Sequence, residues 1–507
     1  MSTTAYLGPP GTGKTYTLIN IVKDALQKGV PPERIGFVSF SKKATEEART
    51  RAARELNLDY KKMVHFRTLH SMAFRQLDMK IDQVLRSSDY RRLEMELGLP
   101  FTSTQSMNIN DGEFFRLGGK GDMYLSIYNM ARVRKISAEQ QFNESANWTL
   151  QHNEMQHVIR SYKEYKQVLE KIDFVDMIET FIEQGEAPEL ELLIVDEAQD
   201  LVPLQWDMVS KLESNSKNVY YAGDDDQAIY EWMGVDARQF ASRCNQSDNM
   251  IVLDQSFRVP SSVHQEADRI IRNAAGRIDK EWNAREQEGH VSYHYKIDEL
   301  PLEEGQWMIL ARTNYIANRI ATDLKNNGYL FWRNGNGWSI ANATLEVVRG
   351  FTRLSRGEEL DHEYISKIWR KIKVDRKTRN AGNKMLKAAE AETFGIEFLE
   401  SLTGQYLQEK HWYEVLEVSD QERVYITSVL ESGEVLDDDN PRIVLSTIHK
   451  AKGGEADNVA LVLESTKACC TMSEPDAERR VFYVGATRAK NNLYIIDNPE
   501  ARWRFQL

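Results

Sequence analysis

Long apolar runs are missing from this sequence and cysteines are few, and each scarcity limits what the chain can be. No apolar stretch approaches the roughly 20 residues that a membrane-spanning helix needs, and the N-terminus has no basic region followed by an apolar stretch. The cysteines are Cys244, Cys469 and Cys470, and adjacent residues such as the last two rarely form a bridge. We therefore expect a cytoplasmic protein with neither a disulfide framework nor a zinc site.

Positive charge is also scarce, because the formal net charge is −12. This balance argues against a protein coated in basic patches that binds nucleic acid by charge alone. A narrow channel with local donors and stacking rings stays compatible with it, and the 10 Trp, 21 Tyr and 18 Phe could supply such rings, although most must fill cores. At 507 residues the chain exceeds what one core usually serves, so we expect two or more domains.

A glycine-rich stretch near the N-terminus fits the phosphate-loop pattern G-x-x-x-x-G-K-[ST]. It consists of Gly8, Pro9, Pro10, Gly11, Thr12, Gly13, Lys14 and Thr15. Residues 5–7 before it are typical of a strand and residues 16–22 after it of a helix, so backbone N–H groups can converge on phosphate oxygens. Lys14 would then reach the terminal phosphates, and the Thr15 hydroxyl would bind Mg²⁺. The motif predicts a site for a nucleoside triphosphate, and the flanking elements disfavour a chance glycine-rich turn.

A second stretch supplies acidic residues at the end of a predicted strand, residues 189–195. Asp196 would hold Mg²⁺ through water, and Glu197 could polarise the attacking water. Acidic residues after a strand are more often a helix cap, but the phosphate loop upstream favours the catalytic interpretation.

The next predicted strand, residues 219–223, leads to three aromatic or amide side chains of interest. Gln227 is a candidate γ-phosphate sensor, because a neutral amide can orient water and phosphate without adding charge. Tyr230 and Trp232 could stack on bases, although composition alone is equally compatible with burial in a core.

Strand–helix alternation marks two α/β regions and predicts parallel sheets covered by helices. The alternation stops between about residues 76 and 173, and again between about 340 and 440, where the sequence is polar and helical. Only the first region has a phosphate loop. The basic run from Lys371 to Arg379 is either a solvated helix face or a DNA contact.

Eight stretches occur in a characteristic order: GPPGTGKT, FSKKATEEA, TLHS, VDEAQD, AGDDDQAIYEWMG, LDQSFR, STIHKAKGGE and FYVGATRAK. In this set the chain resembles the superfamily 1 DNA helicases of the UvrD/Rep/PcrA group over nearly its whole length. The resemblance implies an α/β fold with two RecA-like P-loop motor domains, parallel sheets, and a mainly helical accessory subdomain interrupting each motor. The first motor would span 1–75 and 174–249 with the insertion 76–173, and the second 250–339 and 441–507 with the insertion 340–440.

The resemblance also implies roles at the nucleotide, with ATP and Mg²⁺ as cofactors. Gln227 and Arg258 become γ-phosphate contacts, and Arg488 becomes an arginine finger that reaches across from the second motor. A guanidinium suits this work because it is always charged and meets several oxygens at once. Phe257 resembles the ring that stacks on adenine, and Glu455 closes a motif that faces the nucleotide.

Seven residues match positions that hold single-stranded DNA in the family: Phe40, Thr68, His70, Tyr230, Trp232, Arg312 and His449. The implied activity is an ATP-dependent DNA helicase or translocase that moves 3′ to 5′ on single-stranded DNA and separates duplex. The implied partners are single-stranded DNA, single/double-strand junctions and repair or replication proteins, with no membrane, for a chain that is monomeric or weakly self-associating.

The sequence departs from the family in three places. The family's opening segment, with a glutamine that reads the adenine edge, has no counterpart ahead of Gly8, which leaves the preference for ATP over other triphosphates open. Glu231 and Met233 replace the arginines that flank the tryptophan in the family. The second insertion is short for the group, which favours translocation over processive unwinding.

Two other functions stay open at this point. One is a DNA-binding remodelling protein that ATP switches without much unwinding, and the other is an RNA-directed motor, although no module for reading 2′-hydroxyls is evident. The presence of Glu197, Gln227 and both arginines favours turnover, because a switch can dispense with them. None of these patterns distinguishes repair, replication and recombination.

Overall fold

The structure is a computed structural model that describes residues 1–39, 42–56, 60–101, 119–145, 149–433, 441–471 and 474–507. Its described residues form two compact units. The first comprises residues 1–291, 466–493 and 505–507, and the second comprises 292–465 and 494–504. Residues 250–291 and 466–493 thus group with the first unit, whereas the sequence assigned them to the second motor.

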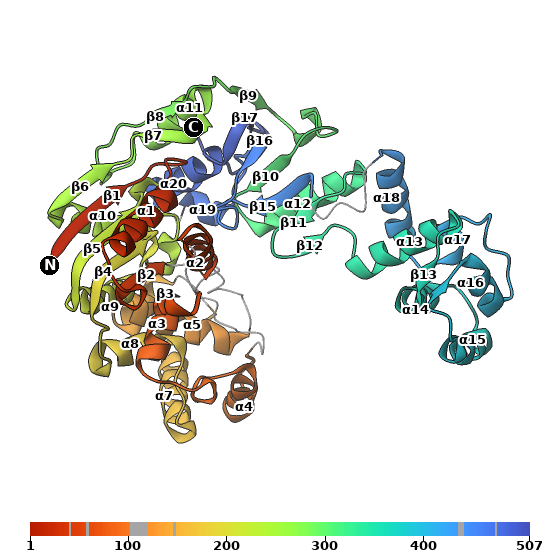
Figure 1. Cartoon of the computed structure of the whole chain (residues 1–507), viewed down its shortest axis with the longest axis horizontal. Coiled ribbons are helices and arrows are strands. Elements are labelled where there is room, and N and C mark those ends of the chain that lie inside the picture. The colour runs from red at the N-terminus through yellow and green to blue at the C-terminus, as the bar shows by residue number, and fades with distance from the viewer. Residues whose placement is uncertain (40–41, 57–59, 102–118, 146–148, 434–440, 472–473) are drawn as a thin grey trace. The chain divides into compact units, whose positions relative to one another are not determined.

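The first unit is built on a six-stranded sheet in the order β3-β2-β4-β5-β1-β6 (Figure 1). Its strands are β1 (Ser2–Leu7), β2 (Ile35–Ser39), β3 (His65–Thr68), β4 (Leu190–Asp196), β5 (Ser216–Gly223) and β6 (Asn249–Val252). All the neighbouring pairs are parallel, with Leu7 opposite Gly223 and Ser39 opposite Asp196. The loops that follow these strands therefore meet at one edge of the sheet, where open α/β sheets bind ligands.

Helices of the first unit cover this sheet and form the insertion. They are α1 (Lys14–Gln27), α2 (Lys42–Leu56), α3 (Leu69–Gln76), α4 (Ser87–Leu97), α5 (Lys120–Arg134), α6 (Ala138–Glu144), α7 (His152–Leu169), α8 (Phe174–Gln184), α9 (Pro203–Glu213), α10 (Ala237–Gln246), α11 (Ser261–Ile271), α19 (Lys467–Thr471) and α20 (Pro475–Ala486). Helix α1 buries Leu18, Ile19 and Val22 in one cluster with Ile35 and Phe37 of β2. Each such side chain stabilises the fold by about 1.5–3 kcal/mol, so this face fixes α1, and the loop ahead of it, to the sheet.

The described residues between 76 and 173, where a helical insertion is predicted, are mainly helical. Helices α4 to α7 lie there, and α7 buries Val158, Tyr162 and Tyr165, which recur with a helical period. They share a core with Leu93 of α4 and Tyr124 of α5. The insertion therefore has a core of its own.

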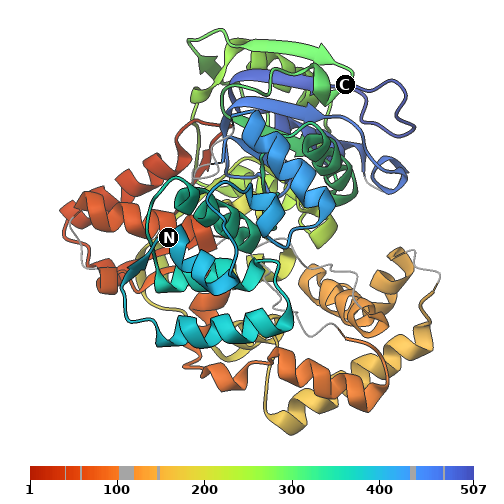
Figure 2. The ribbon, with the colours of Figure 1, turned by 90° about the vertical axis from the view of Figure 1, so that its right-hand side faces the viewer.

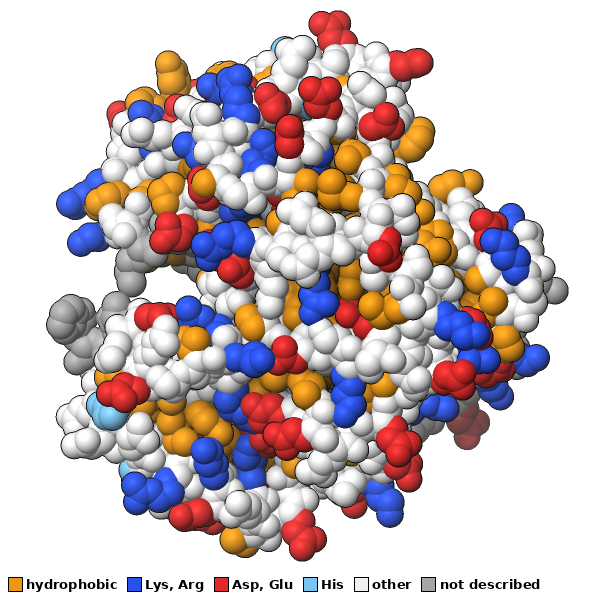
Figure 3. Space-filling model, turned by 90° about the vertical axis from the view of Figure 1, so that its left-hand side faces the viewer, with side chains coloured by type: hydrophobic (Ala, Val, Ile, Leu, Met, Phe, Trp, Pro, Cys, Tyr) orange, Lys and Arg blue, Asp and Glu red, His pale blue; other side chains and the backbone are white. Residues whose placement is uncertain are grey.

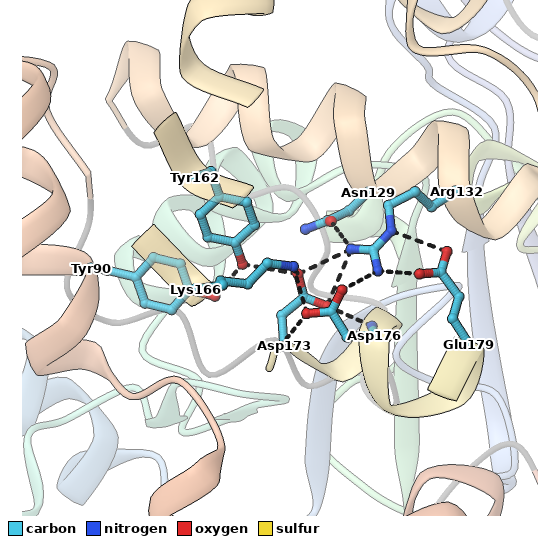
Figure 4. A network of polar contacts seen from close by, with 8 residues as sticks. All are labelled: Tyr90, Asn129, Arg132, Tyr162, Lys166, Asp173, Asp176 and Glu179. Atoms are coloured by element: carbon cyan, nitrogen blue, oxygen red, sulfur yellow. Dashed lines mark hydrogen bonds and ion pairs between the residues drawn. The ribbon is translucent and has the colours of Figure 1, made fainter. Parts of the chain in front are cut away.

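A buried ionic network joins the insertion to α8. Figure 4 shows Arg132 of α5 in contact with Asp173, Asp176 and Glu179, while Lys166 of α7 contacts the two aspartates. Asp173 also caps α8, because its Oδ1 accepts a hydrogen bond from the Asp176 amide at 2.7 Å. Burial raises the pKa of Asp173, but the charges of Arg132 and Lys166 outweigh it and hold that pKa at about 2. The network thus holds α5, α7 and α8 together through charge pairs.

The second unit contains most of a seven-stranded sheet in the order β12-β11-β15-β10-β16-β17-β9. Its strands are β9 (His290–His294), β10 (Trp307–Ala311), β11 (Trp332–Arg333), β12 (Gly337–Trp338), β15 (Ile443–Thr447), β16 (Ala456–Val462) and β17 (Ala489–Ile496). Four neighbouring strands of this sheet, β11, β15, β10 and β16, are parallel. Helix α12 (Asn314–Asn326) packs on them through Ile316 and Ile320. The residues of β9 and β17 are divided between the two units. Two parallel-dominated sheets with covering helices confirm the predicted fold class.

The second insertion is a cluster of helices, turquoise to light blue in Figure 2. It contains α13 (Asn342–Ser355), α14 (His362–Lys371), α15 (Arg376–Ala388), α16 (Ile396–Thr403), α17 (Trp412–Val415) and α18 (Asp420–Glu431). It also contains a short strand pair, β13 (Leu360–Asp361) with β14 (Thr393–Phe394). A second short pair, β7 (Gln255–Pro260) with β8 (Asn283–Arg285), belongs to the first unit. Trp369 is buried in this insertion, under the guanidinium of Arg379 at 4.7 Å from the ring centroid. Arg379 of the basic run therefore takes part in packing, whereas Lys371 and Arg376 are exposed.

Charged side chains of both signs are interspersed on the face drawn in Figure 3. This mixed surface agrees with the net charge of −12. Within the described ranges, none of the helices is both long enough and apolar enough to cross a membrane.

Candidate nucleotide-hydrolysis site

The loop between β1 and α1 has the backbone that phosphate binding requires. Gly11 and Gly13 lie in the left-handed region at φ +74° and +78°, where a side chain would be strained. A side chain at Gly8 would come within 2.0 Å of Lys14, whose Nζ donates to the Gly8 carbonyl at 2.6 Å. The loop therefore places an ammonium, the Thr15 hydroxyl and the N-terminus of α1 together, and this donor set fits a polyphosphate with Mg²⁺.

The segment 256–258 lies directly against this loop. The Phe257 amide donates to the Gly11 carbonyl at 2.8 Å, and Ser256 Oγ donates to the Pro10 carbonyl at 2.7 Å. Contact is so close that a Cβ on Gly11 would stand 2.5 Å from Cβ of Arg258. Phe257 is 72% exposed, and its ring lies beside Gly13. A free aromatic face next to a phosphate loop is suited to stacking on a nucleotide base.

The predicted water-activating acid is held by a neighbouring amide. Asp196 ends β4 and is 2% exposed, and its Oδ1 accepts from the Glu197 amide at 2.9 Å. Glu197 has φ +51°, which is uncommon for a residue with a side chain. Gln199 Nε2 donates to Glu197 Oε2 at 2.6 Å, and Gln199 Oε1 accepts from the Asp224 amide at 3.1 Å. A side chain at Gly223 would meet Gln199 Oε1 at 2.4 Å, so a glycine is needed there.

Sequence reasoning missed Gln199. Its place in the VDEAQD stretch, two residues after Glu197, is the only signal that the sequence offered.

Gln227 and Arg488 are brought together in the first unit from positions 261 residues apart. Gln227 is 5% exposed, its Nε2 donates to Asp224 Oδ2 at 2.7 Å, and its Oε1 accepts from Arg488 Nη2 at 3.2 Å. Arg488 is 2% exposed and its Nε donates to the Val484 carbonyl at 2.9 Å. A continuous series of hydrogen bonds thus runs from Glu197 through Gln199, Asp224 and Gln227 to Arg488.

The residues predicted to hold DNA lie in different environments. Phe40 lies outside the described residues. Thr68 caps α3, where its Oγ1 accepts from the Ser71 amide at 3.3 Å. His70 is buried with its ring edge-on to Phe174, and burial lowers its pKa to about 4, so the ring is neutral near pH 7.

The two aromatic residues after Gln227 differ in exposure. Trp232 is 39% exposed on a short turn, whereas Tyr230 is half-buried and packs on the main core. Their ring centroids are 6.5 Å apart in an edge-to-face arrangement. Glu231 between them is half-buried, and burial raises its pKa although Arg480 opposes this. The Trp232 ring therefore has an accessible face for stacking.

Three predicted residues belong to the second unit. Arg312 follows β10 and His449 follows β15, and these neighbouring parallel strands end with Ala311 opposite Thr447. Both side chains are half-buried at the same edge of that sheet, while Glu455 is exposed just ahead of β16. Arg312 and His449 thus follow the carboxyl ends of two neighbouring strands.

A parallel sheet whose first strand opens into a phosphate loop and a helix, with an Asp-Glu pair at the end of another strand, defines a P-loop NTPase. Comparison with known families gives the particular branch. The model of the UvrD/REP helicase N-terminal domain matches residues 2–247, and that of the UvrD-like helicase C-terminal domain matches residues 422–500. The chain belongs to the UvrD/Rep/PcrA group of superfamily 1 helicases, which confirms the resemblance read from its motifs.

Two curated relatives give the degree of similarity. The chain is 27% identical over 308 residues to the ATP-dependent DNA helicase PcrA of Staphylococcus aureus, which covers 57% of this chain and 40% of the relative. It is 25% identical over 307 residues to PcrA of Staphylococcus epidermidis, which covers 57% of this chain and 41% of the relative. The match therefore spans well under two thirds of these relatives.

Proposed function

We propose that the chain is an ATP-dependent DNA helicase or translocase that moves 3′ to 5′ on single-stranded DNA and separates duplex. One observation carries the proposal: the phosphate loop and the hydrogen-bonded series from Glu197 to Arg488 meet at one edge of one sheet. The Gly8 amide donates to the Gly223 carbonyl at 2.9 Å, and the next residue, Asp224, is part of that series. Membership of the UvrD/Rep/PcrA group supports the same function.

At the nucleotide, each residue has a distinct task. Lys14 and the loop amides would bind the β- and γ-phosphates, and Thr15 and Asp196 would hold Mg²⁺. When bound, Mg²⁺ neutralises the charge that develops on the phosphates. Glu197, held by Gln199, would accept a proton from the attacking water.

Three further side chains would act on the γ-phosphate and the base. The Gln227 amide would orient water and phosphate, and the guanidinium groups of Arg258 and Arg488 would stabilise the transferring charge. Phe257 would stack on the base, and Glu455 is proposed as a further nucleotide-binding residue. In the structure Arg488 contacts Gln227, so it would exchange that partner for phosphate oxygens during the cycle.

The proposed motor domains keep the boundaries 1–75 with 174–249 and 250–339 with 441–507, with hydrolysis of ATP coupled between them. The proposed DNA contacts are Phe40, Thr68, His70, Tyr230, Trp232, Arg312 and His449. The exposed Trp232 has the surroundings that stacking needs, while His70 would have to become accessible first. The proposed partners are single-stranded DNA and single/double-strand junctions, together with repair or replication proteins.

The test is a strand-displacement assay with duplexes that carry either a 3′ or a 5′ single-stranded tail. We expect displacement of the 3′-tailed duplex only, with ATP and Mg²⁺ present, and none with the Glu197→Gln variant. Displacement of the 5′-tailed duplex alone would contradict the polarity. An RNA-tailed substrate that supports the same rate would favour an RNA-directed motor. Nucleotide-dependent DNA binding without displacement or turnover would favour the ATP-switched protein instead.

A further inference from the structure

Three consecutive carboxylates are buried behind the γ-phosphate sensor. Asp224, Asp225 and Asp226 follow β5, and their side chains are 0%, 0% and 1% exposed. One oxygen of each lies within 4.8 Å of the other two. Three like charges at this spacing repel strongly in a medium of low dielectric constant, so the cluster needs positive charge to be stable.

The loop between α11 and β8 supplies that charge. The side chain of Lys280 is also 0% exposed, and its Nζ lies 3.2, 2.6 and 2.8 Å from the carboxylates of Asp224, Asp225 and Asp226. Arg277 adds two hydrogen bonds of 2.7 Å to Asp226. The ammonium occupies the point between the three carboxylates where a cation would otherwise bind, so this cluster is a salt bridge rather than a metal site. We call Lys280, Arg277 and the three aspartates the aspartate clasp.

Burial would lower the pKa of Lys280, but the three carboxylates outweigh it and hold that pKa above its ordinary value. Lys280 is therefore charged at every pH at which the protein would be studied.

The clasp is joined to the sensor through Asp224. Asp224 Oδ1 faces Lys280 and accepts from the Asp226 amide at 3.2 Å, while Oδ2 accepts from Gln227 Nε2 at 2.7 Å. The two oxygens of one carboxylate thus have separate tasks. Fixing Oδ1 fixes the rotation of the carboxylate and hence the acceptor that Gln227 requires.

The orientation of the Gln227 amide depends on this arrangement. Its NH₂ end faces Asp224 and its carbonyl end faces Arg488, so reversing the amide would set donor against donor on one side and acceptor against acceptor on the other. If Arg488 leaves Gln227 for a phosphate, Asp224 is the partner that still holds the amide. The Asp224 carboxylate is in turn fixed by its ion pair with Lys280.

We propose that Lys280 is a positioning residue for nucleotide hydrolysis, which acts through Asp224 to keep the Gln227 amide in its working orientation. This inference rests on the proposed function, because it assigns Gln227 to the γ-phosphate. Lys280 lies 53 positions after Gln227 and is separated from it in space by the carboxylate of Asp224. It contacts neither the phosphate loop nor the substrate itself in this assignment.

The test compares Lys280→Met with a matched control, Lys166→Met. Lys166 is another buried lysine that bridges two aspartates, Asp173 and Asp176, but in the helical insertion. Both variants should lower the melting temperature, because each leaves carboxylates without their cation. Lys280→Met should lower kcat for ATP by about tenfold or more with KM changed by about twofold or less, whereas Lys166→Met should keep kcat within about twofold.

A double-mutant cycle with Gln227→Ala separates positioning from general damage. If Lys280 acts through the amide, adding Lys280→Met to Gln227→Ala should produce no further fall in kcat, measured by a sensitive phosphate-release assay. The same fold-loss in both backgrounds would overturn the proposal, because the lysine would then act independently of Gln227. A Lys280→Met enzyme with wild-type kcat would overturn it too.

The pair Asp225→Asn with Lys280→Met covers the case in which Lys280→Met does not fold. It removes one negative and one positive charge together, so the net charge of the clasp is unchanged, yet Asp224 still lacks its cation. The pair should show the same fall in kcat, and normal kcat in this variant would overturn the proposal. A wild-type protein without ATPase activity would instead contradict the proposed function, so the two failures are distinguishable.

Discussion

Arg488 donates a hydrogen bond to the side-chain carbonyl of Gln227 at 3.2 Å, inside the first compact unit. The candidate finger and the candidate sensor are therefore direct hydrogen-bond partners. Each satisfies polar atoms of the other in a site that is almost closed to solvent, where an unpaired group would be costly. This relationship links the finger to the sensor and, through Asp224 and Gln199, to the acid at Glu197.

Replacing Lys14 by alanine should abolish hydrolysis and weaken nucleotide binding, because the triphosphate loses its principal positive partner in the loop. Binding can be followed with a fluorescent nucleotide analogue and turnover by phosphate release. Lys23→Ala, on the same helix but outside the loop, is the control and should behave as wild type. Full turnover by Lys14→Ala would remove the basis of the nucleotide site.

Replacing Glu197 by glutamine should leave ATP and Mg²⁺ binding intact while hydrolysis falls by orders of magnitude. The phosphate loop stays in place, but the general base is lost. Gln199→Ala should lower kcat by a smaller factor, about tenfold, since it only removes the amide that holds the Glu197 carboxylate. If binding and turnover of Glu197→Gln fell in proportion, Glu197 would be structural.

Trp232→Ala should weaken binding to single-stranded DNA by about 1–3 kcal/mol, as expected for loss of one stacking ring. Thermal stability should barely change, because Trp232 is 39% exposed. The matched control is Trp206→Ala, whose ring is 1% exposed and whose loss should destabilise the fold by about 3–5 kcal/mol without a specific effect on DNA. A large drop in melting temperature for Trp232→Ala would assign its ring to the core.

Acid should weaken the ionic network that joins the helical insertion to α8. The pKa of Asp173 is about 2 in the folded chain and 3.8 as its ordinary value, so its charge stabilises the fold fully above pH 4. That contribution, on the order of 2 kcal/mol, is lost as the pH falls from about 4 to about 2. Urea unfolding across this range should show the free-energy difference between wild type and Asp173→Asn shrinking. The exposed Asp420→Asn control should show no such trend, and a constant difference for Asp173→Asn would contradict the assignment.

The features that could be predicted from the sequence are mostly those that depend on the spacing of residues close together in the chain. The phosphate loop, the Asp196–Glu197 pair and the buried face of α7 each depend on residues close together in the chain, so their geometry follows from local rules. The family assignment and the α/β class were confirmed on that basis.

Contacts made through tertiary packing were not accessible in the same way. Lys280 lies in an irregular loop with no local signature, yet its ammonium ends among three aspartates more than fifty positions earlier. His70 packs against Phe174 of α8, which lies beyond the insertion in the sequence, so no local pattern indicates this contact. The grouping of α20 with the first unit likewise depends on its packing against α11, not on spacing.

Arg488→Ala should cut turnover by about 10³ or more while ATP affinity changes far less, because a finger contributes chiefly in the transition state. Arg243→Ala, which removes another partly buried arginine of the first unit away from Gln227, is the control and should keep its turnover. Wild-type activity in Arg488→Ala would leave Arg258 as the sole arginine at the γ-phosphate.

The rate of ATP hydrolysis by the wild-type chain, measured with and without single-stranded DNA, tests the central claim most directly. Matched RNA and other nucleoside triphosphates serve as controls in the same assay. The account predicts a low basal rate that rises by about tenfold or more with single-stranded DNA and much less with RNA. A rate that is the same with and without DNA would contradict it.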